Sequence, residues 1–177
     1  LHAATIFAWL VLLACQLRFV AAGNFRSHRK LGLGIVLMGP LLVASAALLS
    51  VHSAQEGLAS GRGDFLIVQN VMNTLQLGLL IWLAFVFKAR RKLHGYFLLA
   101  TGVQFFGISL FFTLTALVPM FRIEGPETFH RFQTAAITGQ SACLAVGLLF
   151  LIKDRRNAWP LLLAAAFFPL NDGLRWL

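Results

Sequence analysis

The chain has 177 residues, of which 59% are hydrophobic and 12% are charged, and its mean hydropathy is +0.79. A soluble domain carries about 25% charged residues and could not cover this much apolar surface, so the composition indicates an integral membrane protein. The net charge of +9 would suit nucleic acid, but the basic residues stand in short clusters between apolar segments, as at the cytoplasmic margin of a membrane protein. The composition therefore excludes a nucleic-acid module, a disulfide scaffold and a disordered tail.

Six apolar segments approach the roughly 20 residues that a helix needs to cross a bilayer. In chain order they cover about 3–22, 31–52, 65–87, 93–120, 132–152 and 158 onward. The last is the weakest and carries Pro160 and Pro169. Transmembrane strands would be half as long and would alternate apolar with polar residues, so the pattern predicts an all-α, polytopic transmembrane helical bundle. The connections are short, and we expect residues 1–177 to form a single domain.

The basic residues are divided unevenly between the two sides that this topology defines. One side collects eleven of them with the single acid Asp154: Arg18, Arg26, Arg29, Lys30, Lys88, Arg90, Arg91, Lys92, Lys153, Arg155 and Arg156. The other side holds four arginines and five acids. The positive-inside rule makes the first side cytoplasmic. Leu1 then lies outside, and we expect a truncated N-terminus with one further span upstream.

Three glutamines lie near the predicted midplane of the bilayer. Gln76, Gln104 and Gln140 stand about ten residues from the ends of their segments, or roughly 15 Å at 1.5 Å per residue. Such amides are costly in hydrocarbon and mark functional sites by default. They would either fasten helices together or line a pocket for a quinone headgroup. We favour the structural role, because amide bonds between helices are common.

The fifth segment shows a packing signal. Small residues recur every four positions at Ala135, Gly139, Cys143 and Gly147, a stripe that allows another helix to approach closely. The sequence does not tell whether that helix belongs to this chain or to a partner. Cys143 and Cys15 are both interpreted as packing residues.

The histidines all stand at segment ends. His2, His52 and His130 lie on the outer side, and His28 and His94 lie on the cytoplasmic side. Paired histidines on neighbouring helices hold the irons of di-haem b-type cytochromes, and neutral imidazole is a good axial ligand. The spacing argues against haem, because the 24 residues from His28 to His52 span roughly 36 Å as a helix, more than the roughly 30 Å of hydrocarbon.

In the first two segments a leading His, then a Trp and a Gln, precede an H-R-x-L-G turn; the residues are His2, Trp9, Gln16, His28, Arg29, Leu31 and Gly32. In this pattern the segments resemble a family of uncharacterised bacterial multi-pass membrane proteins. The segment that begins at His94 is similar to a second part of the family. Where the family tends to carry His-Pro, this chain has Trp159 and Pro160. The resemblance implies a bacterial inner-membrane protein, implies an additional upstream span and supplies no activity.

Three functions are compatible with the sequence. The first is an accessory subunit without catalytic machinery, which packs in a larger membrane complex or forms a homo-oligomer. The second is an electron-transfer protein that binds haem b or quinone through the histidines and the midplane glutamines. The third is a small-solute transporter, which would normally carry intramembrane carboxylates, and none stands mid-segment. We place the three in that order.

Overall fold

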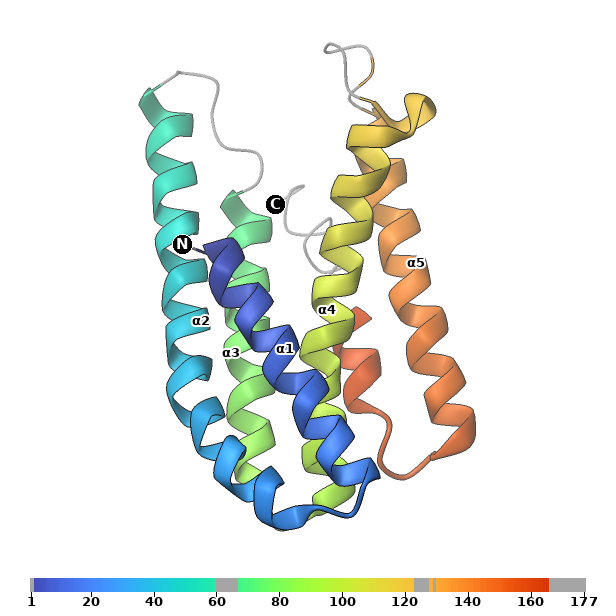
Figure 1. The fold of residues 1–177 in the computed structure, drawn as a ribbon. Coiled ribbons are helices and arrows are strands. Elements are labelled where there is room, and N and C mark those ends of the chain that lie inside the picture. Colours follow the sequence, from blue (N-terminus) through green and yellow to red (C-terminus); the bar gives the residue numbers. More distant parts are fainter. Residues whose placement is uncertain (1, 60–66, 123–127, 129, 166–177) are drawn as a thin grey trace. The chain divides into compact units, whose positions relative to one another are not determined.

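The computed structural model describes residues 2–59, 67–122, 128 and 130–165 (Figure 1). Within these residues the secondary structure is entirely helical. The elements are α1 (His2–Ala21), α2 (Phe25–Ala59), α3 (Ile67–Val86), α4 (Arg91–Leu117), the short 3₁₀ helix η1 (Pro119–Phe121) and α5 (His130–Lys153). Residues 160–165 are also helical. The prediction of an all-α protein is confirmed.

The five α-helices are each long and apolar enough to cross a membrane. They overlap the first five predicted segments. The sixth is helical over 160–165, is not helical at 158 and 159, and lies outside the described residues from 166 onward. Both bounds of α2 were wrong, because we had expected a turn up to Lys30 and a loop from Ser53, whereas α2 begins at Phe25 and extends to Ala59. The extension is rich in helix-forming residues, and the His52 ring and the Glu56 carboxylate meet one turn apart at 3.4 Å, which supports a helix locally.

The described residues divide into two compact units, one up to Ile81 and one from Trp82 onward, and each is described by itself. The prediction of a single domain stays a prediction. In the first unit α1 packs against α2, which is curved (Figure 1). Gly39 marks the closest approach in this unit: a Cβ there would lie 3.1 Å from the Ile81 side chain of α3 and 3.9 Å from the Trp9 ring of α1. The missing side chain of Gly39 therefore lets three helices meet around the buried Trp9.

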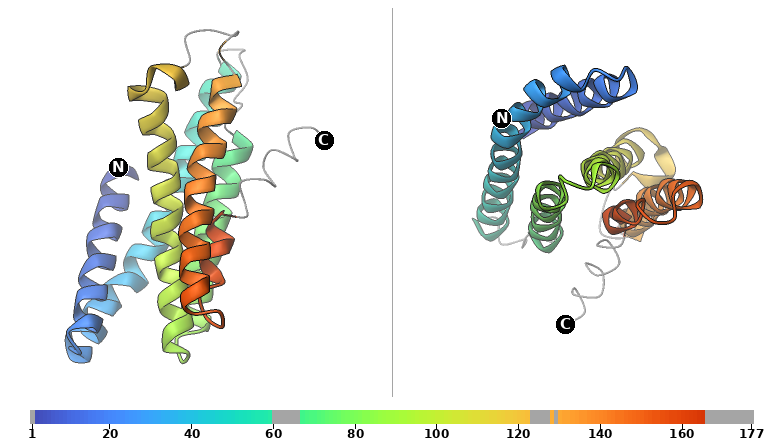
Figure 2. Two further views of the ribbon diagram at one scale, coloured as in Figure 1. Left: turned by 90° about the vertical axis from the view of Figure 1, so that its right-hand side faces the viewer. Right: turned by 90° about the horizontal axis from the view of Figure 1, so that it is seen from below.

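In the second unit α4 and α5 run antiparallel and lie side by side (Figure 2). Phe97 of α4 is fully buried, stacks on Phe87 with ring centroids 5.5 Å apart, and meets Trp159 edge-on at 5.3 Å. The helical residues 160–165 pack on α5, where a Cβ at Gly147 would lie 3.3 Å from the carbonyl oxygen of Leu161. The aromatic contacts of Phe97 and the absence of a side chain at Gly147 together allow α4, α5 and residues 160–165 to pack closely.

Candidate functional site

A hydroxyl and imidazole cluster joins α1 to α2 in the first unit. The Ser45 hydroxyl lies 3.0 Å from His2 Nδ1 and 2.9 Å from the Thr5 hydroxyl. Thr5 donates to the carbonyl of His2 at 2.7 Å, and Ser45 donates to the carbonyl of Leu42 at 2.8 Å. Thr5 and Ser45 are 5% and 4% exposed, so this polar cluster is enclosed by apolar helix.

The number of available protons limits which atom can donate between His2 and Ser45. Each hydroxyl has one proton, and the two carbonyl bonds use the protons of Thr5 and Ser45. The bond between His2 Nδ1 and Ser45 then requires the ring nitrogen to donate. In this arrangement of protons His2 donates from Nδ1 to the Ser45 hydroxyl. We had singled out His2 but missed Thr5 and Ser45, because single hydroxyls are common in apolar helices and carry no spacing signal.

The other two histidines of the first unit lie in different surroundings. His52 is exposed and contacts Glu56. His28 is half-buried in the first turns of α2, and its carbonyl accepts a hydrogen bond at 3.2 Å from the side-chain amide of Gln16. Gln16 is 3% exposed and so ties the end of α1 to the start of α2. His2 and His28 consequently lie near opposite ends of α1.

His94 has a defined orientation in the second unit. Its Nδ1 lies 2.7 Å from the carbonyl oxygen of Ala84. Because a carbonyl can only accept, Nδ1 carries a proton, and in a neutral ring Nε2 would be the nitrogen with the lone pair. A histidine that donates one ring nitrogen to a backbone carbonyl is held in the way that metal-ligating histidines are held. His94 therefore has the geometry of a ligand, a feature visible only in the structure.

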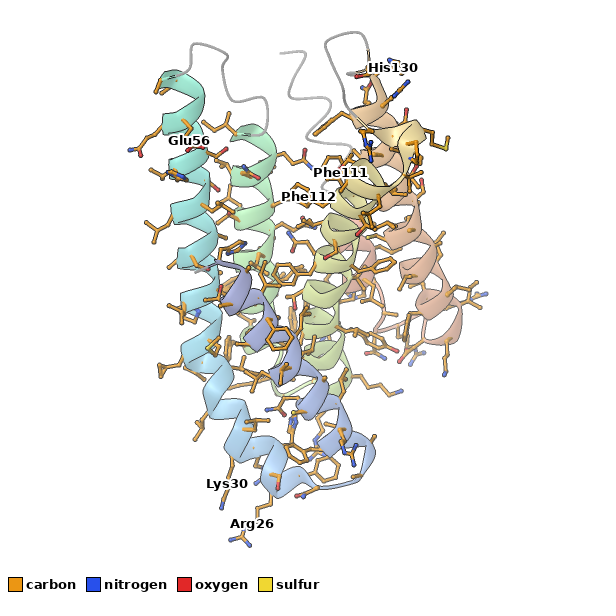
Figure 3. The ribbon with its side chains drawn as sticks, turned by 45° about the horizontal axis from the view of Figure 1, so that its top comes forward. Arg26, Lys30, Glu56, Phe111, Phe112 and His130 are labelled. Carbon is orange, nitrogen blue, oxygen red and sulfur yellow. The ribbon has the colours of Figure 1, made fainter. Side chains whose placement is uncertain are left out.

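The remaining histidine, His130, is exposed at the first residue of α5 (Figure 3). His94 lies near the start of α4, and the two helices are antiparallel, so these histidines are at opposite ends of the second unit. They are too far apart to ligate one iron. Over the residues that the structure describes, no three His, Cys, Asp or Glu side chains are grouped as a metal site.

The three glutamines lie in enclosed positions. Gln76 in the first unit and Gln104 in the second are each 1% exposed. Gln140 donates from Nε2 to the carbonyl oxygen of Ala165 at 3.2 Å. This bond ties α5 to the helical residues 160–165, which favours the structural role for this glutamine.

The small-residue stripe of α5 is a helix contact, and the contacting helices belong to this chain. All four members of the stripe are buried: Ala135, Gly139, Cys143 and Gly147. A Cβ at Gly139 would lie 3.0 Å from the carbonyl oxygen of Gly107 in α4, and the Cys143 thiol donates to the carbonyl of Val103 at 3.3 Å. This stripe is occupied within the second unit, so a partner protein would have to use another face of α5.

Charge is concentrated at helix ends in both units. Arg26 and Lys30 project from the start of α2, and Glu56 lies near its other end (Figure 3). In the second unit the Lys92 ammonium lies 3.5 Å from the Asp154 carboxylate, which places the turn before α4 beside the turn after α5. The Asn157 amide donates to Asp154 at 2.8 Å, and with Lys92 it holds the pKa of that carboxyl below its ordinary value.

No family model, curated protein or solved structure matches the chain. The roles of the histidines, the glutamines and the charged ends are therefore argued from their geometry alone.

Proposed function

We propose that the chain is a multi-pass integral membrane protein whose basic helix ends face the cytoplasm. Its helices expose much apolar surface: between 22% and 28% of the span residues of α1, α2, α3 and α5 are buried, and 50% in α4. On α2, Leu33, Leu37 and Leu48 are 72%, 73% and 64% exposed. Lipid is the solvent that suits such a surface, and the positive-inside rule gives the orientation.

Within the membrane, we propose an accessory subunit that packs against further helices of a larger complex or of a second copy. The support comes from the exposed face of α5, whose first half combines small polar residues with Ile137, which is 52% exposed. Thr134, Thr138 and Ser141 recur at helical spacing and are all exposed. Thr138 bonds back to the carbonyl of Thr134 at 2.8 Å, so its hydroxyl needs no water. Small residues on a helix face allow another helix to approach closely in lipid.

The size of the assembly tests this proposal. Wild-type protein, extracted with its surrounding lipid and weighed by native mass spectrometry, should contain a further protein subunit beside the 19.5 kDa chain after the mass of bound lipid is subtracted. The double variant T138L/S141L should release the partner, because two branched side chains replace the small contact surface. Leu149→Ala is the matched control, since Leu149 lies on the same exposed face but is large and apolar. A wild-type species of 19.5 kDa would refute the accessory-subunit proposal.

A haem- or quinone-binding electron-transfer protein is the second candidate, and His94 is the observation that favours it. Its Nε2 is the nitrogen available to a ligand, because Nδ1 donates to Ala84. The test is an absorption spectrum of the protein purified from its native membrane. A Soret band that is lost in His94→Ala and kept in His52→Ala would favour this candidate over the first. A spectrum without any chromophore would count against haem.

A further inference from the structure

One end of the second unit combines two basic segments that are 60 residues apart in the chain. The first is the turn before α4, with Lys88, Arg90, Arg91 and Lys92, and the second follows α5, with Lys153, Arg155 and Arg156. The antiparallel packing of α4 and α5 brings them together. The 3.5 Å contact between Lys92 and Asp154 and the edge-on contact of Tyr96 with Phe150 at 6.3 Å show that they meet. We call these seven residues the basic end.

The basic end has a large excess of positive charge. All seven basic side chains are exposed, and Asp154 is the one acid among them. The carboxylate of Asp154 faces Lys92 and Asn157, so it offsets one of the seven charges. The start of α4 and the end of α5 both lie here, so their helix dipoles offset each other and the excess charge comes from the side chains. Anions should accumulate at this end.

Apolar side chains adjoin the charges. On the last turns of α5, Leu149 and Ile152 are 67% and 74% exposed, and Trp159 beside the second basic segment is 38% exposed. Tryptophan is enriched where hydrocarbon meets headgroups. A free phosphate ion or an acidic soluble protein would use the charges and make no use of Leu149 and Ile152. A phospholipid uses both, with its phosphate against the arginines and an acyl chain along α5.

We infer that the basic end binds anionic phospholipid headgroups and thereby prefers acidic lipids over zwitterionic lipids of the same chain length. This inference rests on the proposed membrane insertion. Each basic residue near an anionic surface strengthens attraction by about fivefold, and neutralising two of them should weaken binding by about 25-fold. The attraction should weaken as salt is added, because exposed charges are screened.

Native mass spectrometry of the detergent-solubilised protein measures this preference, with dioleoyl phosphatidylglycerol and dioleoyl phosphatidylcholine as probes. Phosphatidylglycerol should bind at least tenfold more tightly, as expected from several basic residues acting together. The variant R155Q/R156Q should lose most of that preference. Asp154→Asn should strengthen phosphatidylglycerol binding by about fivefold, because it removes the one acid of the basic end. A gain and a loss in opposite directions cannot both come from misfolding.

The matched control is R122Q/R131Q, which removes two charges at the other end of the second unit, where Arg131 donates to the carbonyl of Arg122 at 3.1 Å. Its phosphatidylglycerol affinity should stay within about twofold of wild type, since it leaves the basic end intact. Equal binding of the two lipids, or an equal loss in both double variants, would overturn the inference. Displacement of the lipid by inorganic phosphate or by polyglutamate at matched charge would also overturn it. A protein that stays monomeric in buffer without detergent would instead refute membrane insertion.

Discussion

Replacing Gly107 with alanine should destabilise the second unit by a specific steric clash. Gly107 lies in α4 opposite Cys143 of α5, and a Cβ built on it would be 2.5 Å from the Cys143 sulfur. Heavy atoms in favourable contact are about 3.5–4.0 Å apart, so one of the groups must move by about 1 Å. The sulfur has little freedom, because Cys143 is 1% exposed and its thiol bonds to the carbonyl of Val103.

The magnitude follows from two opposing terms. Overpacking a filled contact costs about 1–3 kcal/mol, and replacing a helical glycine with alanine regains about 0.5–1 kcal/mol. The net loss in the free energy of unfolding should be about 1–2 kcal/mol. Gly95 on the same helix has no atom within 4 Å of its built Cβ. Gly95→Ala is therefore the matched control and should be neutral or slightly stabilising.

A double-mutant cycle tests the cause. Cys143→Ala alone should cost about 1 kcal/mol for the lost packing of a small buried group. The double variant G107A/C143A should be more stable than the sum of the single changes by about 1–2 kcal/mol, because the clashing atom is gone. The assay is reversible unfolding in mixed micelles of increasing sodium dodecyl sulfate, followed by circular dichroism. Strict additivity, or an equal loss in Gly95→Ala, would refute the steric argument.

Three further predictions concern the second unit. Gly139→Ala should lower the free energy of unfolding by about 1–2 kcal/mol in the same assay, because the added Cβ would lie 3.0 Å from the backbone carbonyl oxygen of Gly107. Cys143→Ala should not restore this stability, since the clash is with backbone. Full restoration would contradict the contact with Gly107. Gln140→Leu should cost about 1–3 kcal/mol in that assay by leaving the Ala165 carbonyl without its side-chain donor, and unchanged stability would contradict this assignment. The Asn157 amide and Lys92 hold the pKa of Asp154 below its ordinary value. The stabilisation of the folded state by this carboxylate is therefore present above the unfolded pKa, near pH 4, and is lost as the pH falls through the folded pKa. A titration of Asp154 by NMR should show a higher pKa in Asn157→Ala, and an unchanged pKa would contradict the assigned cause.

The helices could be predicted closely because length and hydrophobicity determine them almost alone. An uninterrupted apolar run of twenty or more residues must satisfy its backbone polar groups internally in lipid, and α1, α3 and α5 begin and end within about two residues of the predicted bounds. The end of α2 was predicted less well. Its last residues are polar, and hydropathy does not distinguish a polar helical turn such as that of His52 and Glu56 from a loop.

The candidate site was harder to predict, because a sequence does not show which residues are opposite one another. A shared position at segment ends made the histidines look equivalent, yet His94 is oriented by the carbonyl of Ala84 and His52 is exposed beside Glu56. The hydrogen bond from Gln140 to the carbonyl of Ala165 shows the same difficulty. The sequence contains Gln140, but only the packing of 160–165 on α5 shows that its side chain reaches the carbonyl of Ala165.

The sequence by itself determined that the chain is helical and apolar enough for a membrane, and that its positive charge is concentrated in a few turns, because these properties depend on composition and on order along the chain. Only the tertiary structure decided what each polar or small residue contacts. The stripe of α5 is filled by Gly107 of α4, and the segments around Lys92 and Asp154 form one surface. Both results depend on the antiparallel approach of two helices, which brings distant parts of the chain within contact distance.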